Sequence, residues 1–264
     1  MRYGLLADVH GNLDALGAVL RALDDQGVHG HLFAGDLVGY GPYPNECIHT
    51  MATLGATCVA GNHDLIALGL LSDDRCIDLA KDSLRWTRDV LGADERAFLE
   101  ALPRKATASG GVVLAHGAID DPQEYVSTSP QAVAQLTQVE DRDGAKVLVL
   151  GHTHRPMAYG RRAGWLAADG AIALPEGDAV LLNPGAVGQS RELRARARFA
   201  VLDLDAGRVE FSAVPFDIGG CRAALRRVGL SPRSSHLRPS VPRAAVRAMR
   251  ASMRRRRAAA ARRG

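Results

Sequence analysis

The sequence predicts an α/β protein in which buried strands and amphipathic helices alternate and pack in layers. Short apolar runs of strand length recur along the chain, and a Gly, Asp or His follows each of the first five. Helical patterns lie between the earlier runs, with apolar positions three or four residues apart. With 264 residues, of which 47% are hydrophobic, the chain is long enough for one large domain with its own core.

The first five runs are almost wholly apolar, which is typical of strands that are buried on both faces. They cover residues 3–7, 31–34, 57–60, 112–115 and 146–150. Asn12 is a candidate N-cap for a helix whose apolar positions run from Leu13 to Leu23. A second helix is predicted from Ala80 to Leu91.

The pattern changes between Met157 and Pro215, where short strands are separated by turns that contain Gly. These strands include residues 179–182, 199–204 and 209–214, and they predict a second sheet or the second half of one. A helix is expected over 217–228, and residues 229–235 have the composition of a linker. We therefore expect a main domain over 1–230 and an Arg-rich tail over 231–264, in which Pro242 begins an Ala/Arg-rich helix.

The net positive charge of the chain comes from its C-terminal end. The formal net charge is +4, but every charged residue after Asp217 is an arginine, and there are fourteen of them. Without these the chain has 19 basic against 29 acidic residues, a formal charge of −10. Charge therefore does not predict nucleic-acid binding by the whole protein.

Other features argue against a membrane protein and favour the cytoplasm. No apolar stretch approaches the roughly 18 residues that a membrane-spanning helix needs. Asp8 falls where a secretory signal would keep its apolar core, so export is not expected. The four cysteines lie far apart without a Cys-x-x-Cys pair, so we expect neither a zinc knuckle nor a disulfide framework, and a reducing compartment fits.

Residues able to bind metal follow the predicted strands. The seven candidates are Asp8, His10, Asp36, Asn62, His116, His152 and His154. Open α/β sheets build their sites at the carboxyl ends of strands, and a non-helical backbone can direct both ligands of Asp8-Val9-His10 at one centre. Carboxylates, imidazoles and an amide suit Mn, Fe, Co, Ni or Zn better than Mg. The alternative, ordinary residues that cap turns and helices, does not explain their joint order.

The same residues form five motifs in order: Asp8-x-His10, Gly35-Asp36 followed by Gly41, Gly61-Asn62-His63-Asp64, His116 after an apolar strand, and Gly151-His152-Thr153-His154. Together they resemble the calcineurin-like metallophosphoesterases, and residues 183–189 resemble a loop of small bacterial members. One motif alone would be weak evidence, whereas five in order are specific. The resemblance implies an α/β fold in which a two-sheet β-sandwich is flanked by helices, in four αββα layers.

The resemblance also implies two divalent ions, with Mn or Fe favoured and Zn, Co or Ni as alternatives. Asp36 would bridge them, with Asp8, His10 and His154 on one ion and Asn62, His116 and His152 on the other. In such centres a hydroxide that bridges the metals attacks phosphorus. The implied function of the domain over 1–230 is hydrolysis of a phosphodiester or nucleotide. A phosphomonoesterase with the same metal core is one alternative, and a non-catalytic scaffold, which would lack a ligand, is another.

His63 and Asp64 are the predicted catalytic residues. His63 is similar to the family histidine that contacts the phosphate and protonates the leaving oxygen, and Asp64 is its candidate partner. The alternative is that they contact phosphate and cap a helix without proton transfer. Gly39-Tyr40 stands where protein Ser/Thr phosphatases carry an Asp-Arg pair, so the resemblance does not favour a protein phosphatase.

The Arg-rich tail permits two interpretations. Arg243, Arg247, Arg250 and Arg254 recur at helical spacing, and residues 254–257 are a continuous arginine run. They could bind nucleic acid or another polyanion, or they could form a solvated helix or a disordered tail. The tail has no interleaved aromatic residues, which disfavours stacking on single-stranded bases. No membrane partner is expected.

Overall fold

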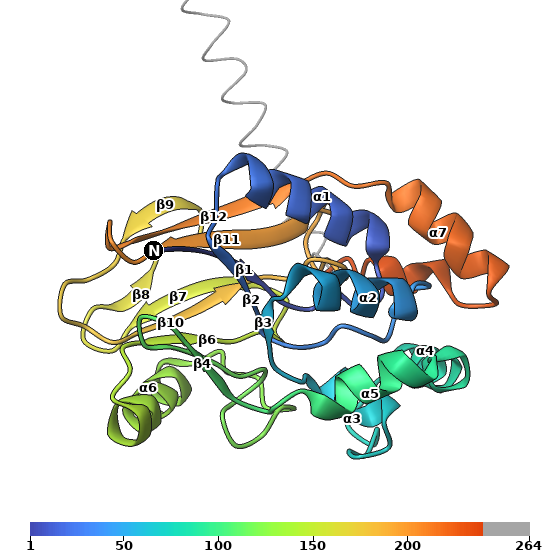
Figure 1. Ribbon diagram of the computed structural model, residues 1–264, viewed down its shortest axis with the longest axis horizontal. Coiled ribbons are helices and arrows are strands. Elements are labelled where there is room, and N and C mark those ends of the chain that lie inside the picture. Colours follow the sequence, from blue (N-terminus) through green and yellow to red (C-terminus); the bar gives the residue numbers. More distant parts are fainter. Residues whose placement is uncertain (240–264) are drawn as a thin grey trace, which may run out of the picture.

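Two mixed six-stranded sheets lie face to face at the centre of the protein, with helices on both outer sides (Figure 1). This arrangement is seen in a computed structural model, which describes residues 1–239 apart from the side chains of residues 142 and 143. The strand order is β3-β2-β1-β11-β12-β9 in the first sheet and β4-β5-β6-β10-β7-β8 in the second. The predicted two-sheet sandwich with flanking helices is confirmed.

Each sheet has a parallel part that contains the apolar runs recognised in the sequence. In the first sheet these parallel strands are β1 (Arg2–Leu6), β2 (Gly30–Phe33) and β3 (Thr57–Cys58). In the second sheet they are β5 (Val112–Leu114), β6 (Val147–Val149) and β10 (Val180–Pro184). Parallel strands end at a common edge, so their following loops are brought together.

The strands after Met157 do not form a sheet of their own, which was one of the two expected alternatives; they form part of each of the two sheets. The first sheet is extended by β11 (Ala197–Asp203), β12 (Arg208–Val214) and β9 (Gly170–Ala173). The second is extended by β7 (Pro156–Gly160) and β8 (Gly164–Leu166), and at its other edge by β4 (Ala106–Ala108). Because a strand edge exposes unpaired backbone groups, the later strands stabilise both parallel parts by pairing with β1 and β10.

The helices form the outer layers (Figure 1). The first sheet is covered by α1 (Leu13–Asp25) and α2 (Pro44–Leu54), with α7 (Ile218–Arg227) beside α1. The second sheet is covered by α6 (Ser129–Asp143). One end of the sandwich carries α3 (Asn62–Ala67), α4 (Asp78–Val90) and α5 (Ala93–Ala101), and the short 3-10 helix η1 (Pro232–Ser235) follows α7. The predicted cap of α1 is confirmed, since Asn12 Oδ1 accepts a hydrogen bond of 3.2 Å from Ala15 N.

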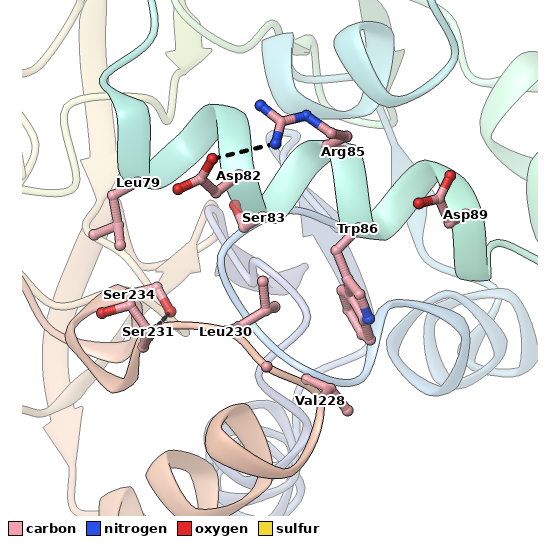
Figure 2. Close-up of a pocket in the computed structure, with 11 residues that line it drawn as sticks. Leu79, Asp82, Ser83, Arg85, Trp86, Asp89, Val228, Leu230, Ser231 and Ser234 are labelled. Atoms are coloured by element: carbon pink, nitrogen blue, oxygen red, sulfur yellow. Dashed lines mark hydrogen bonds and ion pairs between the residues drawn. The ribbon is translucent and has the colours of Figure 1, made fainter.

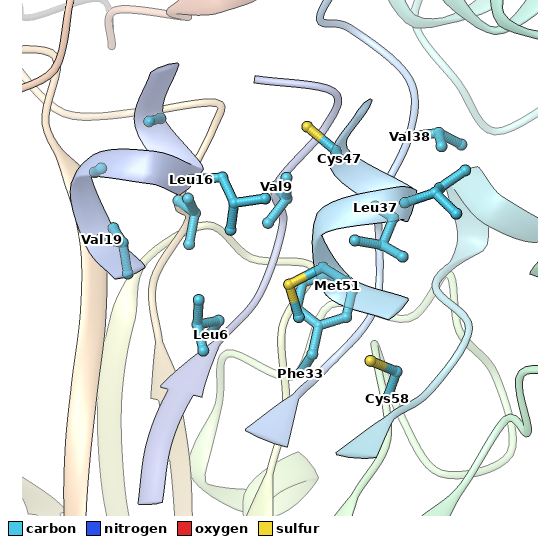
Figure 3. Close-up of a cluster of buried hydrophobic side chains, with 14 of the residues drawn as sticks. Leu6, Val9, Leu16, Val19, Phe33, Leu37, Val38, Cys47, Met51 and Cys58 are labelled. Atoms are coloured by element: carbon cyan, nitrogen blue, oxygen red, sulfur yellow. The ribbon is translucent and has the colours of Figure 1, made fainter. Parts of the chain in front are cut away.

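Alternate residues of the central strands are buried on opposite faces, which explains their continuous apolar sequences. In β6, Val147 and Val149 pack in the core between the sheets, whereas Leu148 packs in the cluster beneath α6. In β1, Leu5 belongs to the core between the sheets. Leu6 belongs instead to the cluster beneath α1 and α2 (Figure 3).

The C-terminal predictions are only partly within the described part of the chain. The Ala/Arg-rich helix predicted from Pro242, with its arginines at 243, 247, 250 and 254–257, lies outside the described residues. The separate tail predicted from residue 231 stays a prediction. Among residues 1–239, no helix has both the length and the apolar character needed to span a bilayer.

We expect Leu148→Ala to lower the free energy of unfolding by about 2–5 kcal/mol, because it leaves a cavity between β6 and α6. Leu148 is fully buried, whereas Leu70 is 59% exposed. The matched control Leu70→Ala should therefore change the free energy by less than about 0.5 kcal/mol. Urea denaturation measures both, and equal effects would contradict the packing described for β6.

Candidate metal centre

All seven predicted ligands meet at the edge where the parallel strands of both sheets end. Asp8 and His10 follow β1, Asp36 follows β2, and Asn62 begins α3 after β3. The second sheet contributes His116 after β5, and His152 and His154 after β6. Each of the seven side chains is at most 7% exposed. Residues separated by up to 146 positions in the sequence, from Asp8 to His154, therefore share one buried site.

Backbone hydrogen bonds fix the ligand loops to one another. Asp8 N donates to Gly35 O over 3.0 Å, and His10 N donates to Asp36 O over 3.0 Å. The two sheets are joined by His152 N, which donates to Asp8 Oδ1 over 3.0 Å. These bonds fix the carboxylate of Asp8 between the two halves of the site.

The backbone of the site adopts conformations that side chains rarely permit. Within residues 1–239, six non-glycine residues have a positive φ: Asp8, His10, Asp36, Tyr40, His152 and His154, with values from 49° to 65°. Such conformations cost on the order of 1–3 kcal/mol each and are found where function requires them. Five of the six are predicted ligands, so backbone strain in this protein is concentrated at the candidate centre.

The first half of the centre is formed by Asp8, His10 and His154, whose ligand atoms lie within 4.8 Å of one another. The Nε2 atoms of His10 and His154 are 3.1 Å apart, and His154 Nε2 is 3.5 Å from Asp8 Oδ1. Both rings direct Nδ1 at a backbone carbonyl oxygen, that of Val38 at 3.1 Å and that of Gln189 at 2.7 Å. A proton on Nδ1 leaves the Nε2 lone pair facing the cluster, which is how metal-binding histidines are oriented.

The second half is formed by Asp36, His116 and His152, again with ligand atoms within 4.8 Å of one another. His116 Nε2 lies 3.2 Å from Asp36 Oδ2 and 3.0 Å from Asn62 Oδ1, and its Nδ1 is 2.7 Å from Ala34 O. Asp36 Oδ2 is also 3.6 Å from His10 Nε2 in the first half. The carboxylate of Asp36 therefore lies between the two halves, as the bridge predicted from the sequence requires.

The unsatisfied atoms of the site fit a cation. Asp8 Oδ2, Asp36 Oδ2 and His152 Nε2 are buried without a hydrogen-bond partner. Buried polar atoms without partners are rare because each costs free energy. The chemistry of the set, carboxylate oxygens and imidazole nitrogens with an amide oxygen beside them, is that of a site for borderline divalent ions.

Most of the candidate ligands have protonation states that suit metal binding, but two would have to release a proton to a metal. Burial raises the pKa of Asp8 to about 7, and, although burial acts in the opposite direction, the neighbouring Asp36 raises the pKa of His116 to about 9. Burial lowers the pKa of His152 to about 3 and those of His10 and His154 well below the usual range, so these rings are neutral and can offer a lone pair at neutral pH. Burial alone would raise the pKa of Asp36, but the neighbouring His116 and His63 hold it well below the usual value. Asp36 is therefore charged at neutral pH.

His63 lies beside the centre, and Tyr40 accounts for its orientation. The Tyr40 ring packs on the His63 ring with centroids 4.8 Å apart, and the His10 ring contacts it at 4.7 Å. Burial lowers the pKa of His63 to about 4. The backbone of Gly39 also lies close to the His63 ring. A Cβ atom on residue 39 would be only 2.3 Å from His63 Nδ1, so a larger residue would collide with the ring. Gly39-Tyr40, which departs from the protein phosphatase pattern, thus forms the wall against His63.

Asp64 contacts backbone rather than the His63 ring in the described hydrogen bonds. Its carboxylate accepts from Asp36 N at 2.9 Å, Val38 N at 3.1 Å and Gly61 N at 2.9 Å. These three bonds hold the loop of Asp36 against the start of α3. The geometry gives Asp64 a positioning function on the Asp36 loop.

The candidate centre opens into a cavity of about 460 Å³ whose wall includes residues that the sequence analysis did not identify. Tyr125 packs on His152 with ring centroids 4.2 Å apart, and Arg191 donates to Tyr125 Oη over 3.2 Å. Arg191 stands two residues after the loop 183–189, and its position near that loop was the available sequence signal. Tyr125 lies in a segment without a motif, so nothing in the sequence marked it.

A larger depression, of about 590 Å³, lies between α4 and the segment after α7 (Figure 2). Its charged residues include Asp82 and Arg85, which pair with each other at 3.5 Å, and Trp86 projects from α4 toward Val228 (Figure 2). No histidine is among the described residues that line it. Its chemistry is therefore unrelated to that of the candidate centre.

Comparisons with known proteins agree with this geometry. A model of the calcineurin-like phosphoesterase superfamily domain matches residues 1–207. A metallophosphoesterase of Sphaerobacter thermophilus is 33% identical, with a TM-score of 0.76 over 89% of this chain and 96% of that one. An uncharacterized protein of Methanocaldococcus jannaschii is 30% identical over 81% of this chain and 87% of its own length. A hypothetical protein of Pyrococcus horikoshii, 19% identical, shares the fold with a TM-score of 0.73 over 88% of this chain and 95% of its own.

We expect Gly61→Ala to weaken Mn²⁺ binding about 10- to 100-fold. The φ of Gly61 is −91°, which any residue adopts, but an added Cβ atom would lie 2.1 Å from Asp36 Oδ1 and 2.3 Å from Asp36 N. The substitution should therefore displace the carboxylate between the two halves. The Mn²⁺-dependent rise in melting temperature measures the affinity.

The matched control is Gly17→Ala in α1, where the new Cβ atom would approach nothing closer than Arg21 Nη1 at 3.4 Å. This variant should bind Mn²⁺ like the natural protein. Unchanged affinity in Gly61→Ala would show that the position of Asp36 does not govern metal binding.

Proposed function

The chain belongs to the calcineurin-like phosphoesterase superfamily, and on this basis we propose that it is a dinuclear-metal-dependent phosphoesterase acting on a phosphodiester or nucleotide. The observation that carries the proposal is the position of Asp36 between two buried clusters, with its Oδ2 atom 3.2 Å from His116 Nε2 and 3.6 Å from His10 Nε2. The Sphaerobacter thermophilus relative, a metallophosphoesterase by description, supports the same reaction class.

In this proposal Asp8, His10, Asp36 and His154 hold one ion, and Asp36, Asn62, His116 and His152 hold the other. Mn or Fe is favoured, because the ligands combine nitrogen and oxygen. Two bound ions supply a nucleophilic hydroxide near neutral pH and neutralise charge on the phosphoryl oxygens. The chain itself supplies buried side chains whose rings are already oriented by backbone carbonyls.

We assign His63 to the leaving oxygen and Asp64 to the backbone that carries Asp36. Since burial lowers the pKa of His63 to about 4, the ring needs the negative charge of a bound phosphate ester to retain its second proton near neutral pH. Proton donation to the leaving group contributes about 10²- to 10⁴-fold to rates in general. The three backbone hydrogen bonds of Asp64 fix the loop on which the shared ligand lies.

The cavity supports an ester with an organic group rather than phosphate alone. Its volume is about 460 Å³, and Ile77 and Tyr125, which are 54% and 47% exposed, line it together with Leu237. These apolar surfaces suit the alcohol or nucleoside part of a substrate. A phosphomonoesterase with the same metals is the alternative. A non-catalytic scaffold is disfavoured because the full set of ligands is present.

We place the reaction in a reducing compartment such as the cytoplasm. Cys47, Cys58 and Cys221 are buried and form no disulfide, and Cys76 is also free. Burial raises the pKa of Cys58 and of Cys221 to about 12, so their thiols are unreactive at neutral pH.

Asp36→Asn should abolish hydrolysis and lower the metal content, because a neutral amide cannot replace the shared carboxylate. His63→Asn should retain both metals and lower turnover about 10²- to 10⁴-fold. The measurements are metal analysis and rates with Mn²⁺ on matched aryl phosphate mono- and diesters. Full activity of Asp36→Asn would refute the dinuclear proposal, and a rate ratio that favours the monoester would select the alternative.

The tail proposal is that the arginines after residue 239 bind a polyanion and concentrate it near the acidic domain. Residues up to 239 should be kept in its test, because Leu237 N donates to Ser190 O over 3.1 Å and Leu237 lines the cavity. Deletion of 240–264 removes nine arginines. We expect it to weaken binding to duplex DNA or heparin by at least about tenfold at low salt and to reduce the salt dependence. Equal affinities would reject the polyanion function.

A further inference from the structure

Arg191 has an unusual position for a cation in this protein. Its side chain is partly buried and lines the cavity together with Asp36, His152 and His154. Its Nη2 atom lies 3.4 Å from His154 Nε2, the atom that we assign to a metal. The guanidinium therefore reaches the edge of the candidate centre.

The described contacts of Arg191 are all with uncharged groups. Nε donates to Gln189 Oε1 over 3.2 Å, and Nη1 donates to Tyr125 Oη over 3.2 Å. Among residues 1–239, no carboxylate forms an ion pair with this guanidinium. Its charge therefore has no counter-charge from the protein at hydrogen-bond distance.

Two other arginines near the site form ion pairs. Arg75, which lines the same cavity, contacts Asp121 Oδ2 at 2.8 Å, and Arg198 contacts Glu192 Oε1 at 2.7 Å. The pairing of Arg75 neutralises its charge, whereas that of Arg191 remains. Removing a cation from water costs free energy unless an anion compensates its charge. The described part of the chain provides no such anion for Arg191, so we look for it in a ligand.

The missing anion must also be compatible with the metals. A guanidinium at the edge of a centre that binds two divalent cations is repelled by them, and this repulsion weakens metal binding. A phosphoryl group that contacts both the metals and the guanidinium removes the repulsion. The planar fork of arginine fits two oxygens of a phosphate, and its pKa keeps it charged throughout the neutral range.

We propose that Arg191 binds the non-bridging oxygens of the substrate phosphoryl group, with Gln189 and Tyr125 holding the guanidinium in place. This assignment rests on the proposed function, because the phosphoryl group must occupy the metal centre. Gln189 Oε1 and Tyr125 Oη hold Nε and Nη1, so Nη2 is the donor directed at the centre. Tyr125 also packs on the His152 ring. It therefore links the Arg191 guanidinium to a candidate ligand of the second half of the centre.

The test compares the Mn²⁺-loaded natural protein with Arg191→Gln by calorimetric titration with inorganic phosphate. We expect the affinity for phosphate to fall about 10- to 100-fold, as for loss of a charged hydrogen bond. The affinity for Mn²⁺ in the absence of phosphate should stay the same or increase, because a repelling charge has been removed. A side chain with only a structural function would not give these opposite changes.

Two further variants complete the experiment. Arg194→Gln removes a positive charge from an exposed residue of the same loop, which does not line the cavity, so its phosphate affinity should stay within about twofold of the natural protein. Arg191→Lys keeps the charge without the fork and should give an intermediate loss. Melting temperatures and metal contents confirm that each variant is folded and loaded.

The outcomes separate this inference from the proposed function. If the natural protein binds Mn²⁺ and phosphate and hydrolyses the diester, and Arg191→Gln binds phosphate equally well, only the assignment of Arg191 is wrong. If the Mn²⁺-loaded natural protein neither binds phosphate nor hydrolyses esters, the proposed function fails and the assignment fails with it. Equal losses in Arg191→Gln and Arg194→Gln would also overturn the assignment, because they would indicate a general effect of charge.

Discussion

Buried carboxylates and imidazole nitrogens that crowd around one space govern the rest of this structure. Asp8 and Asp36 are at most 1% exposed, and each has a carboxylate oxygen without a hydrogen-bond partner. Such an arrangement is unfavourable unless cations occupy the space between these groups. The sandwich, the strained ligand loops and the bonds between them all serve to bring these groups together.

The two-sheet architecture provides the geometry for this convergence. Each sheet contributes a parallel part, and the ends of both parts meet at one edge. The bond from His152 N to Asp8 Oδ1 crosses from one sheet to the other, and Asp64 fixes the Asp36 loop through three backbone bonds. The left-handed backbone of the ligands is maintained by these contacts, so the stability of the fold offsets the strain of the site.

Much of the site could be predicted because its residues follow strand ends in a specific order. The apolar runs that predicted β1 and β6 are buried on both faces, and the motifs after them contain all seven candidate ligands, which the fold brings together. The sequence could not divide the strands after Met157 between the two sheets, because pairing depends on which edges remain open. Helices α2, α3, α5 and α6 were not identified, since their patterns are short or weakly amphipathic. Arg191 stands near a loop that the sequence did single out, but its place in the cavity wall, like that of Tyr125, depends on loop geometry that local sequence does not encode.

The electrostatics of the site differ between its two sides. The ligands present negative charge and lone pairs to the space between the clusters, and Arg191 presents positive charge from the cavity wall. An anion at the cavity side and cations between the clusters would satisfy both. A basic residue without an ion pair in the described part of the chain therefore stands beside a candidate cation site.

The most direct test is crystallography of the Mn²⁺-soaked protein with anomalous diffraction at the manganese edge. The account predicts two anomalous peaks, about 3.5–4 Å apart, one among Asp8, His10 and His154 and the other among Asp36, His116 and His152, with Asp36 contacting both. A single peak at full occupancy, or peaks outside these clusters, would contradict it.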